Sequence, residues 1–121
     1  MKKFKRVTIV LSMFICIFCI TAFANAGSYT STYEMTGGVF SKWIHPTSKC
    51  TITVYPKSGT DGQDMGVIWA KKTALGWDGK QKWTSSTQPG TVTFKSSKKR
   101  KVWLRNYTGF KWTGSVSFTW D

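Results

Sequence analysis

Residues 50–55 read CTITVY, and this stretch decides the fold class. Successive side chains of a strand point to opposite faces of a sheet, and β-branched residues favour strands. Cys50, Ile52 and Val54 therefore share one face, while the threonines and the tyrosine between them share the other. The pattern predicts a half-buried strand in which Cys50 is a small buried hydrophobe rather than a reactive thiol.

Similar short alternating runs, divided by glycine, proline and serine, continue on both sides of this strand. They lie at residues 29–35, 39–44, 65–74, 92–94, 101–107 and 115–121. The pair Asp78-Gly79 is a strong signal for a two-residue hairpin turn. No helical period extends beyond a turn. About seven short strands predict an all-β protein, a small antiparallel β-sandwich or barrel.

The first residues differ in composition from the rest. A basic segment, MKKFKR, precedes an apolar run at residues 7–23, and ANA at residues 24–26 offers a signal peptidase site. We predict a cleaved secretory signal peptide at residues 1–26 and a single all-β domain at residues 27–121, secreted and extracellular. An uncleaved anchor is the alternative, because about 17 apolar residues is the lower limit for a spanning helix. No transmembrane segment is expected in the mature chain.

The predicted mature chain is strongly basic. Without residues 1–26 it keeps 14 of the 18 basic residues and all five acidic ones, so its net charge is about +9. Such a charge attracts polyanions. We expect an anionic cell-envelope polymer, lipid or cell-wall precursor as partner, and nucleic acid binding only as non-specific electrostatics. Cys50 is the one cysteine left, which excludes an intrachain disulfide framework.

Residues suited to catalysis or metal binding are few. The chain has one histidine, His45, and one glutamate, Glu34. The two could form the acid–base pair of a small secreted nuclease, although no sequence spacing supports this. Residues 61–64 carry two aspartates around a glycine but lack the further oxygen ligands of a calcium loop. We therefore predict no catalytic residue, no metal site and no cofactor.

Basic and aromatic residues concentrate in residues 98–112, KKRKVWLRNYTGFKW. Strand alternation points Val102 and Leu104 inward. It places four residues in an outward row: Lys99, Lys101, Trp103 and Arg105. The loop at residues 106–114 either exposes its aromatic residues to a partner or folds back over one end of the core. The predicted contacts to an anionic surface are Lys98, Lys99, Arg100, Lys101, Arg105 and Lys111. The predicted aromatic contacts are Trp103, Phe110 and Trp112.

Two further expectations concern structure rather than binding. Basic side chains on an edge strand discourage association between sheets, which requires no ligand. Because the mature chain has few leucines and isoleucines, we also expect part of the tryptophans to build the core. The tryptophans considered for the core are Trp43, Trp69, Trp83 and Trp120.

The segment Gly66–Lys71, GVIWAK, resembles the GVWAK segment of the lactococcin-type secreted bacteriocins, with one additional isoleucine. The near-terminal Phe118 and Trp120 are a further point of similarity. The resemblance implies a non-enzymatic β-sandwich that binds the lipid-linked precursor of peptidoglycan. With the charge of the chain, it favours a secreted cationic protein that acts at a bacterial cell envelope as an antimicrobial factor. The alternatives are a polysaccharide- or cell-wall-binding module and a small secreted nuclease or hydrolase.

Overall fold

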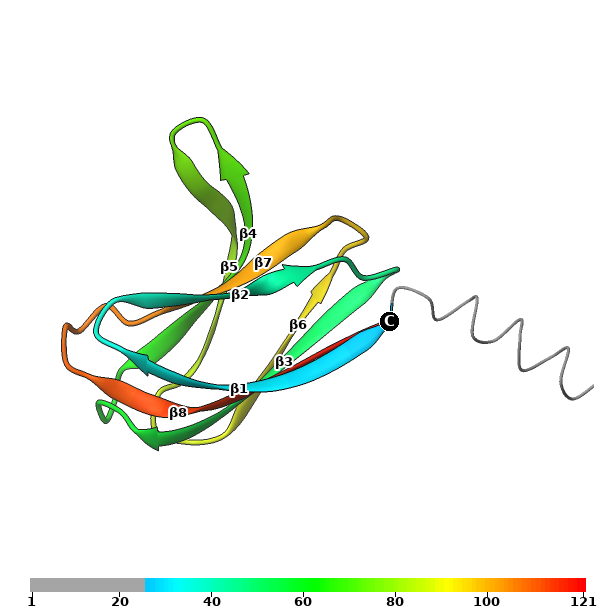
Figure 1. The fold of residues 1–121 in the computed structure, drawn as a ribbon. Coiled ribbons are helices and arrows are strands. Elements are labelled where there is room, and N and C mark those ends of the chain that lie inside the picture. Colours follow the sequence, from blue (N-terminus) through cyan, green and yellow to red (C-terminus); the bar gives the residue numbers. More distant parts are fainter. Residues whose placement is uncertain (1–25) are drawn as a thin grey trace, which may run out of the picture.

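The protein is a sandwich of two antiparallel sheets, as the computed structural model of residues 26–121 shows (Figure 1). The predicted all-β sandwich is thus confirmed. Its eight strands, one more than expected, are β1 (Gly27–Met35), β2 (Gly38–Ile44), β3 (Lys49–Ser58), β4 (Asp64–Thr73), β5 (Gly76–Ser85), β6 (Gly90–Lys95), β7 (Arg100–Arg105) and β8 (Trp112–Trp120). The predicted signal peptide lies outside the described residues except for Ala26.

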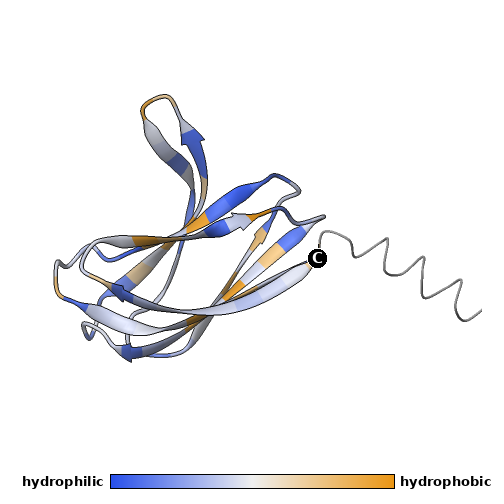
Figure 2. Ribbon diagram, in the orientation of Figure 1, coloured by the Kyte–Doolittle hydropathy of each residue, from blue (hydrophilic) through white to orange (hydrophobic). Residues whose placement is uncertain are grey.

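One sheet has the strand order β1-β8-β3-β6 and is called the β1-sheet below. The other has the order β2-β7-β4-β5 and is called the β2-sheet. Within the described part of the chain, no helix is long and apolar enough to span a membrane. Figure 2 shows how hydrophobic and hydrophilic residues alternate along the strands.

The core lies between the sheets and follows the predicted alternation. Cys50, Ile52 and Val54 on β3 are fully buried, and Val102 and Leu104 on β7 face the same interior. Since Cys50 is a free thiol, packing rather than a disulfide stabilises this part of the chain. Burying these alternate apolar side chains is the main favourable contribution to such a fold.

Two local predictions are wrong. Strand β7 is paired with both β2 and β4 and is therefore not an edge strand. The β4–β5 turn lies at Ala74-Leu75, because Thr73 pairs with Gly76. Asp78 and Gly79 are paired residues of β5, and Gly79 approaches the β4 backbone so closely that a Cβ atom would lie 2.0 Å from the Trp69 carbonyl oxygen. Gly79 is thus required for close approach, not for a turn.

Strand β2 contains a bulge. Phe40 pairs with Trp103 and Trp43 pairs with Lys101, so β2 uses one residue more than β7 between the two pairs. A bulge leaves backbone donors without ladder partners. Here the Val102 amide donates to Ser41 Oγ at 2.7 Å. The backbone amide of Lys42, within the bulge of β2, donates to the hydroxyl of Tyr29 at 2.9 Å.

The Cys50 thiol should be inert in the folded protein. Burial, and to a smaller extent the charge of Asp121, raises its pKa to about 12. Only the thiolate reacts with alkylating reagents. We expect no labelling by iodoacetamide at pH 8 without denaturant and complete labelling in 6 M guanidinium, measured by mass spectrometry. Rapid labelling of the folded protein would contradict the assigned place of Cys50.

Trp112, predicted as an exposed contact residue, is fully buried in the core. It is the first residue of β8, and its indole Nε1–H donates to Thr60 Oγ1 at 2.7 Å. The loop before it, by contrast, exposes 70% of Phe110. The loop of residues 106–111 is held by Asn106, whose amide donates to the Met35 carbonyl at 3.1 Å. Trp112 therefore belongs to the core and Phe110 to the surface.

Substitution of these two aromatic residues should have very different effects on stability. Trp112→Ala should lower the free energy of unfolding by about 3–5 kcal/mol, because it leaves a cavity. Phe110→Ala should change it by no more than about 0.5 kcal/mol, because the ring is exposed. Guanidinium denaturation followed by circular dichroism measures both. Similar losses in the two variants would show that the loop, and not Trp112 alone, packs on the core.

Candidate binding face on the β2-sheet

Aromatic rings form two groups across the outer face of the β2-sheet, the face directed away from the β1-sheet. The ring centroids of Trp43 and Trp77 are 5.7 Å apart, and Trp77 is 4.8 Å from Phe40. Phe40 stacks on Trp103 at 5.0 Å with an interplanar angle of 13°. At the other end, Trp83 contacts Tyr107 at 5.7 Å. Aromatic pairs at these distances attract one another beyond simple burial.

Basic side chains link and flank these aromatic rings. The Arg105 guanidinium lies 4.3 Å from the Trp103 ring and 5.0 Å from the Tyr107 ring, and so links the two parts. Lys101 Nζ lies 5.2 Å from Trp43 and 5.6 Å from Trp77. Lys99 Nζ lies 5.9 Å from Trp43. These are cation–π distances. We call this set the aromatic–basic face: Phe40, Trp43, Trp77, Trp83, Trp103, Tyr107, Lys99, Lys101 and Arg105.

The positive charges of Lys99, Lys101 and Arg105 are available to a ligand. Within residues 26–121, neither lysine nor the arginine of the face forms an ion pair with an acid. Arg105 Nε is also buried without a hydrogen-bond partner. Figure 2 shows the hydrophilic start of β7, where this part of the face begins. An anion that approaches the face therefore does not have to displace a carboxylate.

Two glycines let the large side chains lie directly on the sheet. A Cβ atom on Gly66 would lie 3.1 Å from Tyr107 Cε2, and one on Gly38 would lie 2.7 Å from Trp103 Nε1. The Tyr107 hydroxyl is fixed at its far side by the Gln81 amide, which donates to it at 3.0 Å. Bare backbone beneath aromatic rings is a known way to stabilise strands that contain glycine.

The predicted outward row from Lys99 to Arg105 is confirmed. Lys99, Lys101, Trp103 and Arg105 all contribute to the aromatic–basic face. The remaining predicted basic residues lie apart from its rings. Lys98 is exposed in the β6–β7 loop, and the Arg100 guanidinium donates to the Lys99 carbonyl at 2.8 Å. Lys111 forms an ion pair with Glu34.

The expectation that tryptophans fill the core holds only in part. Trp69 is buried and Trp120 packs against the core. Trp43 and Trp83, in contrast, are 45% and 55% exposed and belong to the aromatic–basic face. Trp43 is on the outer face because of the β2 bulge, which strand alternation alone does not reveal.

Phe40, Trp77 and Tyr107 were not singled out from the sequence as binding residues. Phe40 gains its place because β2 pairs with β7, a contact between segments far apart in the chain. The nearest sequence signal for the orientation of Phe40 was strand alternation within residues 39–44, and the bulge in β2 interrupts that alternation. Tyr107 lies in the loop after β7, as predicted, and continues the alternation of Trp103 and Arg105 by two residues.

The acid–base pair considered for a nuclease is not assembled. Glu34 precedes the β1–β2 connection and pairs with Lys111, whereas His45 follows the opposite end of β2. No group of three or more histidine, cysteine or carboxylate side chains within residues 26–121 is arranged to hold a metal ion.

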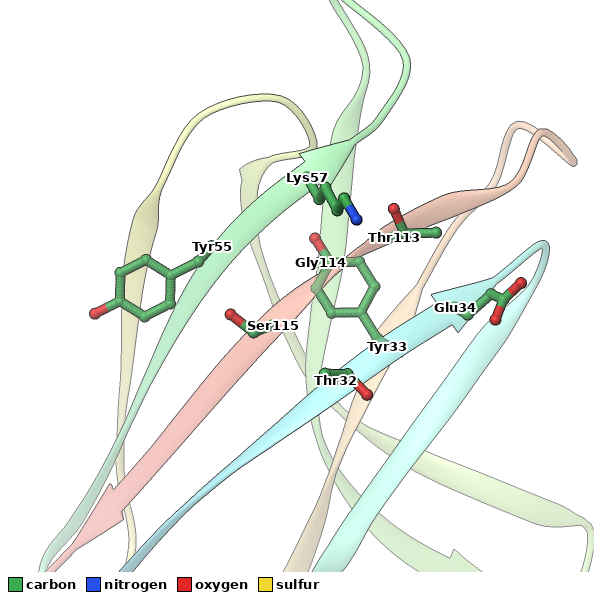
Figure 3. Close-up of a pocket in the computed structure, with 8 residues that line it drawn as sticks. All are labelled: Thr32, Tyr33, Glu34, Tyr55, Lys57, Thr113, Gly114 and Ser115. Atoms are coloured by element: carbon green, nitrogen blue, oxygen red, sulfur yellow. The ribbon is translucent and has the colours of Figure 1, made fainter.

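The β1-sheet has a different outer surface. Hydroxyl groups pair across β3 and β6, with Thr51 Oγ1 3.3 Å from Thr93 Oγ1 and Thr53 Oγ1 3.2 Å from Thr91 Oγ1. A shallow cleft of about 450 Å³ lies over Gly114, and Figure 3 shows the eight residues that line it: Thr32, Tyr33, Glu34, Tyr55, Lys57, Thr113, Gly114 and Ser115. The cleft includes two charged side chains and two tyrosines, but the aromatic–basic face has the larger group of rings and cations and is the more distinctive binding surface.

Comparison with known proteins finds similarity in fold only. No family model and no curated protein matches the chain. A mitogen derived from Yersinia pseudotuberculosis has a TM-score of 0.52 and 12% sequence identity, covering 79% of this chain and 87% of the mitogen. A chain of Bacillus endospore appendages, described as disulfide-linked pili, has a TM-score of 0.46 and 10% identity, covering 78% and 84%. The mitogen shares the fold of this chain, and the similarity extends no further.

Proposed function

We propose that this protein is a secreted, non-enzymatic binding protein that attaches to an anionic polymer of a bacterial cell envelope. The observation that supports this proposal is the aromatic–basic face, a continuous row of rings joined by cations that have no acidic partner. Rings and cations in one row suit a ligand that combines sugar or polyol units with negative charge.

The two kinds of side chain would contribute differently to binding. Exposed rings such as Trp43 and Trp83 offer apolar surface to the C–H faces of sugars. The planar guanidinium of Arg105 suits carboxylate or phosphate groups, which it can bind through two N–H donors at once. The net charge of the domain adds long-range attraction, which accelerates encounter with a polyanion.

Variants of the aromatic–basic face test this proposal. Trp43→Ala combined with Trp77→Ala should weaken binding to purified anionic cell walls about tenfold, a loss of about 1.4 kcal/mol. Lys101→Gln should weaken it as well and reduce its dependence on salt. Co-sedimentation with cell walls over a range of NaCl concentrations measures both effects.

Two matched controls accompany these variants. Phe110→Ala removes a more exposed ring away from the face, and Lys57→Gln removes one charge on the β1-sheet. Both should bind like the parent protein. If the controls lose as much binding as the face variants, attachment depends on overall charge and hydrophobicity rather than on this face.

Antimicrobial action is the more specific form of the proposal and has its own test. The purified protein should inhibit the growth of bacteria whose envelope carries an anionic polymer. Lys99→Glu combined with Lys101→Glu should abolish the inhibition, whereas Lys57→Glu should preserve it. Growth curves and vital staining measure the outcome. Attachment without inhibition would contradict antimicrobial action and leave the binding role in place.

A further inference from the structure

A second cleft lies at the open edge of the sandwich, where β5 faces β6. Its volume is about 310 Å³, and its lining residues are Trp69, Lys80, Lys82, Thr93, Phe94 and Lys95. Trp69 and Lys80 are direct partners in the β4–β5 register, and strand alternation turns both away from the outer face. The cleft is therefore distinct from the aromatic–basic face.

Three lysines surround this cleft, and none of its lining residues is acidic. Lys82 reaches from β5 to β6, where its Nζ donates to the Thr93 carbonyl at 2.5 Å and lies 5.3 Å from the Phe94 ring. An ammonium group has three N–H donors, so this contact leaves two for a ligand.

Trp69, one of the residues that line the cleft, carries a hydrogen-bond donor without an acceptor. Trp69 is 7% exposed and stacks on Phe94, with ring centroids 5.8 Å apart and an interplanar angle of 19°. Its Nε1–H is buried and has no partner. Buried indole N–H groups usually have one. A negatively charged acceptor would therefore serve both the Trp69 N–H and the ammonium groups of the lysines.

We infer that this cleft binds a phosphate group carried by a small polyol or sugar unit. A phosphate group offers a separate acceptor oxygen for each of the Trp69 N–H and the ammonium groups of Lys80 and Lys82. The cleft is larger than a phosphate ion, which leaves space for the attached unit beside Phe94 and Thr93. The site is independent of the role proposed for the aromatic–basic face.

NMR titration of the ¹⁵N-labelled protein tests the inference at the indole itself. Inorganic phosphate and glycerol phosphate are added separately at constant ionic strength, adjusted with NaCl. The indole N–H resonance of Trp69, assigned with Trp69→Phe, should shift and saturate. The resonance of Trp112, which already donates to Thr60, serves as the internal reference and should not move.

Lysine variants show whether the cleft or overall charge is responsible. Lys80→Gln, an exposed position, should weaken phosphate binding about tenfold. Lys57→Gln makes the same change of charge on the β1-sheet and should have no effect. Trp43→Ala with Trp77→Ala should also leave the titration unchanged, which separates this site from the aromatic–basic face.

The outcomes are distinct. Tighter binding of glycerol phosphate than of inorganic phosphate supports the inference in full. Equal binding of the two retains the phosphate site and overturns the attached polyol or sugar unit. A Trp69 resonance that does not respond, or an equal loss in Lys80→Gln and Lys57→Gln, would overturn the site.

Discussion

One extra residue in β2 determines what the β2-sheet presents to its surroundings. Phe40 and Trp43 are three residues apart, so a regular strand would point them to opposite faces. The bulge between them turns both rings outward, and it is stabilised because the hydroxyls of Ser41 and Tyr29 accept the backbone donors released from the ladder. The row of rings depends on this local irregularity, since without it either Phe40 or Trp43 would face the core.

The place of Trp77 among these rings depends on close approach of the backbone. Trp77 lies on β5, three strands away from β2 in the sheet order, yet its ring contacts both Phe40 and Trp43. The end of the β4–β5 hairpin leaves the plane of the sandwich, as Figure 1 shows, and this allows the contact. Gly79 permits the tight pairing in this hairpin, since any side chain there would collide with the Trp69 carbonyl.

Alternation within single strands was readable from the sequence, and contacts between strands were not. The period of two located the buried faces of β3 and β7 and the outward row from Lys99 to Arg105. It failed at Trp43, where a bulge changes the parity, and at Trp112, which proved to begin a strand. The Asp78-Gly79 pair has a turn sequence, but in this fold the close approach of β4 decides its conformation. Pairing partners such as β2 with β7 arise from tertiary packing, for which one sequence carries no local signal.

The scarcity of acids explains how the cations of the aromatic–basic face are positioned. Glu34 pairs with Lys111, and Asp121 accepts hydrogen bonds from Ser48 and from the amide of Lys49, which hold its pKa below the usual range. The cations of the face are ordered by aromatic rings instead. A carboxylate would neutralise a cation as it fixed its position. A ring attracts the cation through its quadrupole but carries no net charge. Ordering by rings therefore leaves the full positive charge of Lys101 and Arg105 available to an external anion, so the same contacts that build the face also maintain its capacity to bind.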